Sequence, residues 1–362
     1  MQDRDTAATP AKGLRRWART GLTYAIAGLA GWTAHTLGAP LAWMLGPFFA
    51  CAAASAMGVR LTTIPFSRQL AQITIGLGIG LRFTPETLLA TLALTPAMLV
   101  ATVYVIAYTL GAAFLFRPLA GVGRPTAFFA TAAGGVADMA VVARDKGGDA
   151  SAVALVQALR VSITVAVVPI LVITFGTPGT IPDAAPPLTA DTLLPLLLAF
   201  AVAILAARAL NLTRLPNAWL VAPMLLGLSL GATGTLSASV PSGAILAAQL
   251  FLGTWLGTQF QREMLLALPR VALAGVCASG FMIVAAFAGA LVLSAATGLP
   301  MATAFLALAP AAVTEMVITA KVMHLDPEII TGFHILRIFI VISTATLVYR
   351  LYQRIGDRLG AG

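Results

Sequence analysis

The chain has 362 residues, of which 59% are hydrophobic and only 10% are charged, and its mean hydropathy is +0.94. Soluble domains are ~45–50% apolar and ~25% charged, so this chain lacks the polar surface that a water-soluble globule needs. The 22 Lys and Arg against 13 Asp and Glu give a net charge of +9, but the cations stand near the N-terminus or at the ends of apolar runs. That placement excludes a DNA-binding module and is typical of an integral membrane protein.

Residues 1–21 carry five cations ahead of the first apolar run. A secretory signal peptide begins in the same way, but the run that follows is long, contains His35 and shows no small-residue cleavage site. We therefore expect a basic cytoplasmic N-terminus followed by a retained first helix.

Apolar runs cut at charges, Pro and Gly predict two sets of six hydrophobic segments, which we call the first repeat (22–176) and the second repeat (192–350). A Pro-rich linker, 177–191, separates the repeats, and 351–362 forms the C-terminal tail. The expected segments are 22–38, 41–58, 67–83, 88–116, 125–147 and 150–175, then 192–210, 217–234, 243–260, 264–297, 301–324 and 326–350.

The two repeats align residue by residue, which indicates an internal duplication. Residues 127–160 align without a gap on 304–337, and ten of the 34 positions are identical, among them Arg160 and Arg337. A second block at the same offset pairs three polar or glycine residues of each repeat: Gln72, Gly76 and Gly80 with Gln249, Gly253 and Gly257. Ala- and Leu-rich sequences align with each other easily, but matching Arg and Gln residues are not an effect of composition.

The loop charges predict the orientation of the chain. The linker 177–191 has two Asp and no Lys or Arg, so we expect it outside, and the basic N- and C-termini are expected in the cytoplasm. Each repeat then crosses the membrane an odd number of times despite its six segments. Either the fifth segment enters and returns, or the third is too short to cross. Both assignments predict an all-α membrane protein of two inverted repeats, with an interrupted or re-entrant fifth segment in each.

Two acids lie in the middle of the fifth segments, at equivalent positions. Asp138 follows the sequence AAGG (132–135), with Gly134 and Gly135, and Glu315 follows APAA (309–312), with Pro310. A buried acid at the bilayer centre costs at least ~2.5–3.5 kcal/mol, and glycine or proline there frees backbone groups that can bind ions. We expect the two acids to belong to a substrate or coupling-ion site and to carry protons there. The alternative is that they pair structurally with a buried cation.

Arg160 and Arg337 are those candidate cations, because they stand about ten residues into the sixth segments. At ~1.5 Å per residue, this depth is near the middle of the membrane. They could neutralise Asp138 and Glu315, or grip an anionic substrate with two hydrogen bonds each. The sequence leaves both roles open.

Four more polar residues occupy matched positions. Gln72 and Gln249 recur on the third segments, each followed by Gly at four and eight residues further on, a spacing that favours close helix packing. Gln157 and His334 lie one turn before the arginines. All four are candidates to line the same site, although a lone histidine in a helix is more often a hydrogen-bonded core residue.

The sequence does not favour an enzyme, a metal site or a cofactor. His35, His324 and His334 have no metal-ligand spacing on one helix face, and Cys51 and Cys277 lie in separate apolar segments. No Gly-rich phosphate loop follows a strand. The expected partners are the lipid bilayer and a small-molecule or ion substrate, with no nucleic acid, and a homo-oligomer is compatible with the sequence.

Several stretches resemble the AbrB membrane family of Gram-negative bacteria, which is unrelated to the soluble DNA-binding protein of that name. They are GPFFACAAA, RQLAQITIGLGIG, APMLLGLSL, AAQLFLGTWLG and TEMVITAKVMHLDPEIITGFHILRIFIV, and the resemblance covers about residues 22–350. It implies a multi-pass protein of the bacterial inner membrane. Family members carry the labels of gene-expression regulator and of ammonia monooxygenase, but no DNA-binding segment or oxygenase metal site is visible here. We therefore expect a secondary transporter of a small solute, with regulation as the alternative and the monooxygenase as the least favoured function.

Overall fold

The structure is a computed structural model that describes residues 10–39, 41–134, 136–175, 189–213, 217–236, 238–260 and 262–358. Side chains are described throughout these ranges except at 10–15, 136–138, 175, 190, 264, 265 and 342. Within them the chain forms 16 helices and no strand, so the predicted all-α class is confirmed.

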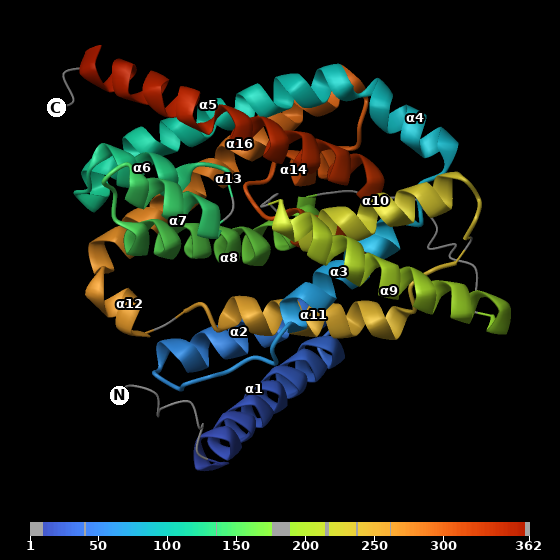
Figure 1. Cartoon of the computed structure of the whole chain (residues 1–362). Helices are drawn as coiled ribbons and strands as arrows, with labels where there is room; N and C mark the ends of the chain where they lie inside the picture. Colours follow the sequence, from blue (N-terminus) through green and yellow to red (C-terminus); the bar gives the residue numbers. More distant parts are fainter. Residues whose placement is uncertain are drawn as a thin grey trace, which may run out of the picture. The chain divides into compact units, whose positions relative to one another are not determined.

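The helices fall into two sets of eight in the same order (Figure 1). The first set is α1 (Pro10–Thr36), α2 (Ala42–Ala56), α3 (Ser67–Gly80), α4 (Pro85–Ala93), α5 (Thr95–Ala120), α6 (Arg124–Thr131), α7 (Val136–Asp145) and α8 (Ala150–Phe175). The second set is α9 (Ala190–Leu212), α10 (Ala218–Ala232), α11 (Ser242–Gly257), α12 (Arg262–Ala267), α13 (Pro269–Thr297), α14 (Met301–Leu308), α15 (Val313–Val322) and α16 (Pro327–Arg358).

Four of these helices are long and apolar enough to cross a membrane: α5, α8, α9 and α13. Helix α16 bends by 62° between Val341 and Ser343, so its two arms count as a fifth candidate only if together they form one span. By contrast α2, α10 and α11 have 15, 15 and 16 residues, short of the ~20 that a straight span needs. The chain is thus a multi-pass membrane protein.

Several predicted boundaries differ from the observed ones. α1 begins at Pro10, twelve residues before the expected first segment 22–38, and α16 continues to Arg358, beyond the expected last segment 326–350. Both extensions contain Leu and several Arg, which are strong helix formers. The fourth segment of each repeat is also split, into α4 and α5 and into α12 and α13. Prolines at the start of α5 and α13 begin a new helix there. Most of the linker 177–191 lies outside the described residues.

The chain forms two compact units, and each draws on both repeats. Unit 1 comprises Met1–Ala71 and Leu246–Leu266, and unit 2 comprises Gln72–Ile245 and Ala267–Gly362. In unit 1, α1 packs on α2. Helix α11 also meets α2 closely, because a Cβ added at Gly253 would collide with the Met44 carbonyl.

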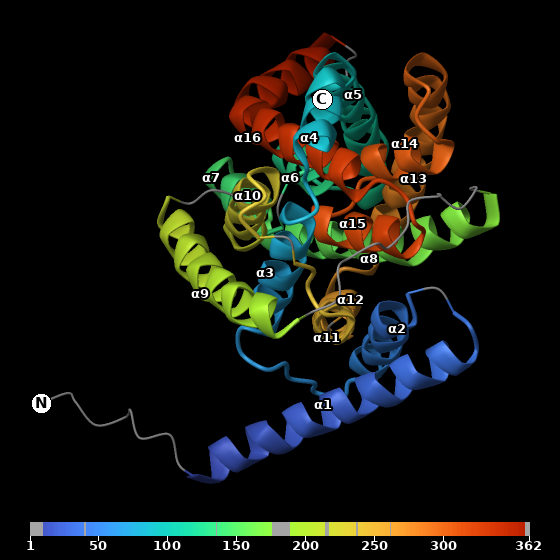
Figure 2. The same cartoon turned by 90° about the vertical axis from the view of Figure 1, so that its right-hand side faces the viewer.

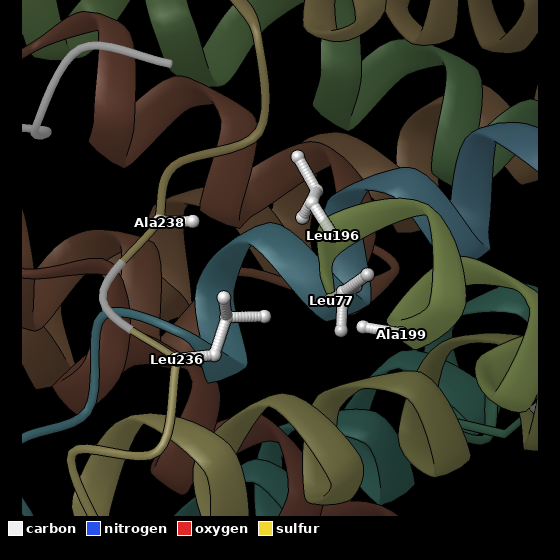
Figure 3. Close-up of a cluster of buried hydrophobic side chains, with 5 residues drawn as sticks. All are labelled: Leu77, Leu196, Ala199, Leu236 and Ala238. Carbon is white, nitrogen blue, oxygen red and sulfur yellow. The ribbon is translucent and has the colours of Figure 1, made fainter. Parts of the chain in front are cut away.

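Unit 2 contains the corresponding contact with the repeats exchanged, between α3 of the first repeat and α10 of the second. On α3, Gly76 and Gly80 face the backbone of α10, where a Cβ would collide with the carbonyls of Leu220 and Met224. Close packing at the predicted Gly-x-x-x-Gly spacing is therefore confirmed. The side of α3 that bears Leu77 packs in a cluster of small and branched residues from α3, α9 and the segment after α10 (Figure 3): Leu77, Leu196, Ala199, Leu236 and Ala238.

The rest of unit 2 is built from long helices and two broken ones. α5 packs on α13, while α16 packs on α5 and its counterpart α8 packs on α13. The broken pair α6 and α7 packs on α8, and α14 and α15 pack on α16 and also touch α8 (Figure 2). Most packing relations of one helix set thus have a counterpart in the other. This arrangement brings both broken helices into one body.

Candidate functional site

The two fifth segments are both interrupted, as the sequence predicts. α6 ends at Thr131 and α7 starts at Val136, while α14 ends at Leu308 and α15 starts at Val313. The first residue of each break has nearly the same extended backbone, with φ −55° and ψ 139° at Ala132 and φ −57° and ψ 137° at Ala309. In the second break Pro310 explains this conformation, because proline excludes the helical region for the residue before it.

Each break exposes helix-end carbonyls that need hydrogen-bond donors, since the last four carbonyls of a helix have no partner within it. Arg160 Nη1 donates to the Ala132 carbonyl at 2.6 Å, and its Nη2 reaches the Gly134 carbonyl at 3.4 Å. In the other break, Arg337 Nη1 donates to Ala309 O at 2.9 Å and Nη2 to Ala311 O at 3.0 Å.

These contacts give the arginines a role that neither sequence hypothesis included. Both side chains are only 4% exposed. A guanidinium at a helix C-terminus also faces the negative end of the helix dipole, which is a favourable position for a cation. Inside a bilayer an unpaired carbonyl costs several kcal/mol, so the arginines stabilise the irregular backbone of the breaks.

Gln157 and His334, one turn before the arginines, form hydrogen bonds with carbonyls at the ends of the same helices, α6 and α14. Gln157 Nε2 donates to Phe129 O at 2.8 Å and to Ala132 O at 2.9 Å. His334 Nε2 lies 2.9 Å from Leu306 O, and its Nδ1 lies 2.7 Å from Nη2 of Arg337. Because arginine can only donate, Nδ1 is the acceptor and Nε2 carries the proton. His334 is therefore a neutral imidazole in this arrangement.

Tyr108 is a site residue that the sequence analysis missed. It lies on α5, is 5% exposed, and donates its hydroxyl to the Leu308 carbonyl at the end of α14 at 2.8 Å. The next carbonyl along the chain, that of Ala309, is the one to which Nη1 of Arg337 donates. One signal could have identified it, since a tyrosine within an apolar span needs a partner for its hydroxyl.

Of the two acids, only Glu315 has a described side chain. It is 5% exposed and is the third residue of α15, in the first turn, where the helix dipole favours a negative charge. Asp138 has the equivalent position on α7, but its side chain lies outside the described part of the chain, as does Gly135. Gly134 lies in the first break, beside the Met139 side chain.

The two remaining candidates are farther along the chain from the breaks. Gln72 lies on α3 and is 6% exposed, and Gln249 lies on α11 and is 4% exposed. Gln72 belongs to unit 2 with the breaks, whereas Gln249 belongs to unit 1. Within the ranges that the structure describes, no three His, Cys, Asp or Glu side chains group so that they could hold a metal ion.

Two small pockets open in unit 2, and each has about 20 Å³ that the centre of a water molecule can occupy. The first runs along α15 beside α3 and contains two cationic residues, Arg82 and Lys321. The second lies over the first break, against Ala132 and Ala133, and reaches the bend of α16 at Val341. Ala132, whose carbonyl accepts from Arg160, is therefore one of the residues that line the second pocket.

The sequence profile of the family described as "Transition state regulatory protein AbrB" matches residues 2–88 and 43–353. The chain belongs to the AbrB family. Since the match spans both repeats, the duplicated helices and the two breaks lie within the family's common region.

Two relatives of this AbrB-family chain come from distant bacteria. "Uncharacterized protein YhjN" of Bacillus subtilis (strain 168) is 30% identical over 246 residues, which are 64% of this chain and 64% of that protein. "Putative regulator AbrB" of Escherichia coli (strain K12) is 28% identical over 335 residues, 89% of this chain and 93% of that protein. The match to YhjN thus covers less than two thirds of that protein, whereas the match to the E. coli protein is nearly complete.

Proposed function

We propose that this AbrB-family protein is a secondary transporter that moves a small solute through a site at the two helix breaks. The observation that carries the proposal is the pair of broken helices in unit 2, each with its helix-end carbonyls held by a buried arginine. Secondary transporters are commonly built from duplicated halves, with interrupted helices around the substrate near the bilayer midplane. The irregular backbone of a break is tolerated at membrane depth only inside protein or beside a water-filled cavity.

In this proposal the two acids bind the coupling ion, which is a proton or sodium. Glu315 begins α15, and Asp138 has the equivalent place in α7, so each break has a cation on one side and an acid in the helix that follows. The repeats are inverted relative to each other, as the loop charges predict. Reciprocal packing of the two helix sets supports a two-fold relation between them.

Binding is the first test. Purified protein in detergent is screened for thermal stabilisation by acetate, succinate, glycine, glucose, ammonium and sodium, beside Asp138→Asn and Glu315→Gln. A ligand at 100 times its Kd stabilises the folded state by about 2.7 kcal/mol. The matched control is Glu86→Gln, because Glu86 is an exposed acid in the first turn of α4.

Transport is the second test, with the same solutes applied as concentration jumps to proteoliposomes while internal pH and sodium are recorded. We expect one solute to enter with a proton or with sodium, and we expect Glu315→Gln to abolish the coupling while Glu86→Gln does not. If no solute binds and none crosses, and both acid variants only melt at a lower temperature, the acids are structural and the proposal fails.

The alternative function is regulation of gene expression, which the descriptions of the family and of the E. coli relative favour. Under the transporter proposal, any such effect is indirect and depends on what crosses the membrane. The two functions separate in a deletion strain complemented with Glu315→Gln. Restoration of normal transcript levels by this variant, if it is transport-inactive, would support direct regulation.

We place the protein in the bacterial inner membrane with both termini in the cytoplasm and the linker outside. Single cysteines at positions 190 and 360, in a background with Cys51→Ala and Cys277→Ala, test the orientation. A membrane-impermeant maleimide should label position 190 on intact spheroplasts and position 360 only after lysis. Labelling of position 360 from outside would reverse the topology.

A further inference from the structure

An ion pair joins the two repeats beside the broken helix of the second. Arg82, two residues past the end of α3, donates from Nε to Oε1 of Glu328 in the first turn of α16 at 3.1 Å. The two side chains are 25% and 7% exposed, so water and salt screen this pair less than they screen an exposed one. The pair therefore holds the end of α3 against the start of α16, two segments that are 246 residues apart in the chain.

Arg82 also lines the first pocket, which lies between α3 and α15. The lining includes residues in or just after α3 and residues of α15: Ile75, Ile79, Arg82, Val317, Ile318 and Lys321. About 20 Å³ of this pocket can be occupied by the centre of a water molecule, which is room for about one water. In this structure the pocket is therefore too small to admit a solute.

The pocket follows α15 toward the second break. Ile318 is three residues after Glu315, so the two residues lie on the same face of α15, one turn apart. Ile318 is 3% exposed, whereas Val141, its counterpart in α7, is 47% exposed. The cover over this part of α15 is thus not a feature that both broken helices share. A solute could approach Glu315 along this face only if α3 and the start of α16 moved apart.

The ion pair has no counterpart in the duplication. At the offset that relates the other matched residues, Arg82 corresponds to Gln259 and Glu328 to Ser151. Neither Gln259 nor Ser151 carries a charge, so an equivalent ion pair is impossible. In inverted repeats the two broken helices have opposite orientations in the membrane, and the pair therefore acts on one side only.

We propose that the Arg82–Glu328 ion pair is a gate that closes one access route to Glu315. This inference rests on the proposed transport function, in which the site is open to one side of the membrane at a time. Under the proposed orientation the C-terminus is cytoplasmic and α16 begins outside, so the gate closes the outer side. Removal of either partner takes this interaction from the closed state and favours the open one.

The experiment measures how fast a membrane-impermeant maleimide reacts with Ile318→Cys in full-length protein in detergent. The two native thiols are removed by Cys51→Ala and Cys277→Ala, and intact-protein mass spectrometry follows the reaction. We expect slow labelling while the ion pair is intact, and labelling faster by about tenfold or more in Arg82→Gln and Glu328→Gln. Tenfold corresponds to about 1.4 kcal/mol, which lies between the values for exposed and for buried ion pairs.

Three controls separate the gate from a general loosening of the fold. The charge-exchanged protein, Arg82→Glu with Glu328→Arg, can form the pair again and should return to slow labelling. Arg124→Gln breaks another ion pair between the repeats, that of Arg124 with Asp357 at the other end of α16, and should leave the rate unchanged. A second reporter, Ser279→Cys, detects unfolding, because Ser279 is fully buried on α13 in the same unit.

Glu328→Asp keeps the test open if the uncharged variants do not fold, because it keeps the charge and only lengthens the distance to Arg82. Ile318→Cys should then react at a rate between those with the native pair and with Glu328→Gln, while Ser279→Cys stays slow. Fast labelling of Ile318→Cys with the pair intact, or equal rates in all variants, overturns the gate. Labelling of Ser279→Cys that rises in parallel with Ile318→Cys in every variant also overturns it, because the pair is then a structural contact.

The labelling needs no solute, so this inference and the proposed function can fail separately. If the rates do not change but a Glu315-dependent flux is found in proteoliposomes, the gate is overturned and the transporter stands. If Glu328→Gln exposes position 318 but no solute binds or crosses, the proposed function fails, and the pair remains a gate on the access of water to α15.

Discussion

Replacement of His334 by leucine tests whether the break in the second repeat depends on its carbonyl partners. His334 is 0% exposed and lies on α16, one turn before Arg337. Its Nε2–H donates to Leu306 O at 2.9 Å, and its Nδ1 accepts from Nη2 of Arg337 at 2.7 Å. Leucine can make neither contact, so one buried carbonyl and one guanidinium N–H lose their partner.

Each buried group left without its partner costs about 1–3 kcal/mol. Nη2 of Arg337 still has the Ala311 carbonyl at 3.0 Å, so the loss on that side is the smaller of the two. We therefore expect His334→Leu to lower the free energy of unfolding by about 2–5 kcal/mol. His334→Gln is the matched control, because its amide can donate to Leu306 O and its oxygen can accept from Arg337. Gln157 already holds the equivalent carbonyl, Phe129 O, in the first repeat.

Thermal unfolding followed by circular dichroism in one detergent measures the difference. For soluble proteins of this length, 1 kcal/mol corresponds to about 1–2 °C, so His334→Leu should melt several degrees lower and His334→Gln within about 1 °C of wild type. Equal melting of His334→Leu and wild type would show that the break does not need these hydrogen bonds. Equal losses in both variants would mean that ring packing, not hydrogen bonding, is what matters at this position.

Three further pairs of substitutions test the helix packing and the loops with the same assay. Gly80→Ala puts a Cβ into the α10 backbone and should cost ~1–3 kcal/mol, whereas Gly280→Ala, with nothing within 4 Å of the new Cβ, should gain ~0.5–1 kcal/mol. Gly147→Ala should cost ~1–2 kcal/mol because Gly147 has φ +78°; His324, its counterpart in the duplication, has φ +54°, so His324→Gly should stabilise. Asp149→Ala should cost ~1 kcal/mol and Asp149→Asn much less, since its Oδ1 accepts from two backbone N–H groups at the start of α8. If Gly80→Ala leaves the stability unchanged, the close approach of α3 to α10 is contradicted. Unchanged stability of His324→Gly would contradict the strain inferred from its positive φ, and unchanged stability of Asp149→Ala would contradict its role at the start of α8.

The duplication made much of this fold predictable. Pro310 and the glycines after Ala133 disfavour continuous helix, so both breaks could be located from the sequence alone. The Gly-x-x-x-Gly spacing on α3 and α11 likewise predicted tight packing, because only glycine lets two helix backbones approach so closely. Helix ends were less predictable, since the basic residues around Arg16 are good helix formers and continue α1 beyond the apolar run.

The contacts of the arginines could not be predicted in the same way. A sequence names the donors, but every residue has a carbonyl, so nothing in it shows that Ala132 O and Ala309 O are the acceptors. Charge alone pointed to the acids Asp138 and Glu315 as partners. Only the structure identifies the carbonyls at the ends of α6 and α14 as the acceptors, because it shows α6 packed on α8 and α14 packed on α16.

Tyr108 shows a different limit of prediction from the sequence, because it has no matching residue in the other repeat. This asymmetry also bears on how the proposed site would orient a solute. Positions that match between the repeats make matching contacts, as Arg160 and Arg337 do with their breaks. Tyr108 corresponds to Ala285, so a comparison of the repeats cannot reveal it, and within the described part of the chain a tyrosine hydroxyl reaches the break of the second repeat but not that of the first. A solute bound between two equivalent breaks would meet the same donors on both sides and could sit in either direction. Under the proposed function, the unmatched Tyr108 is therefore the feature that fixes which end of the solute faces which repeat.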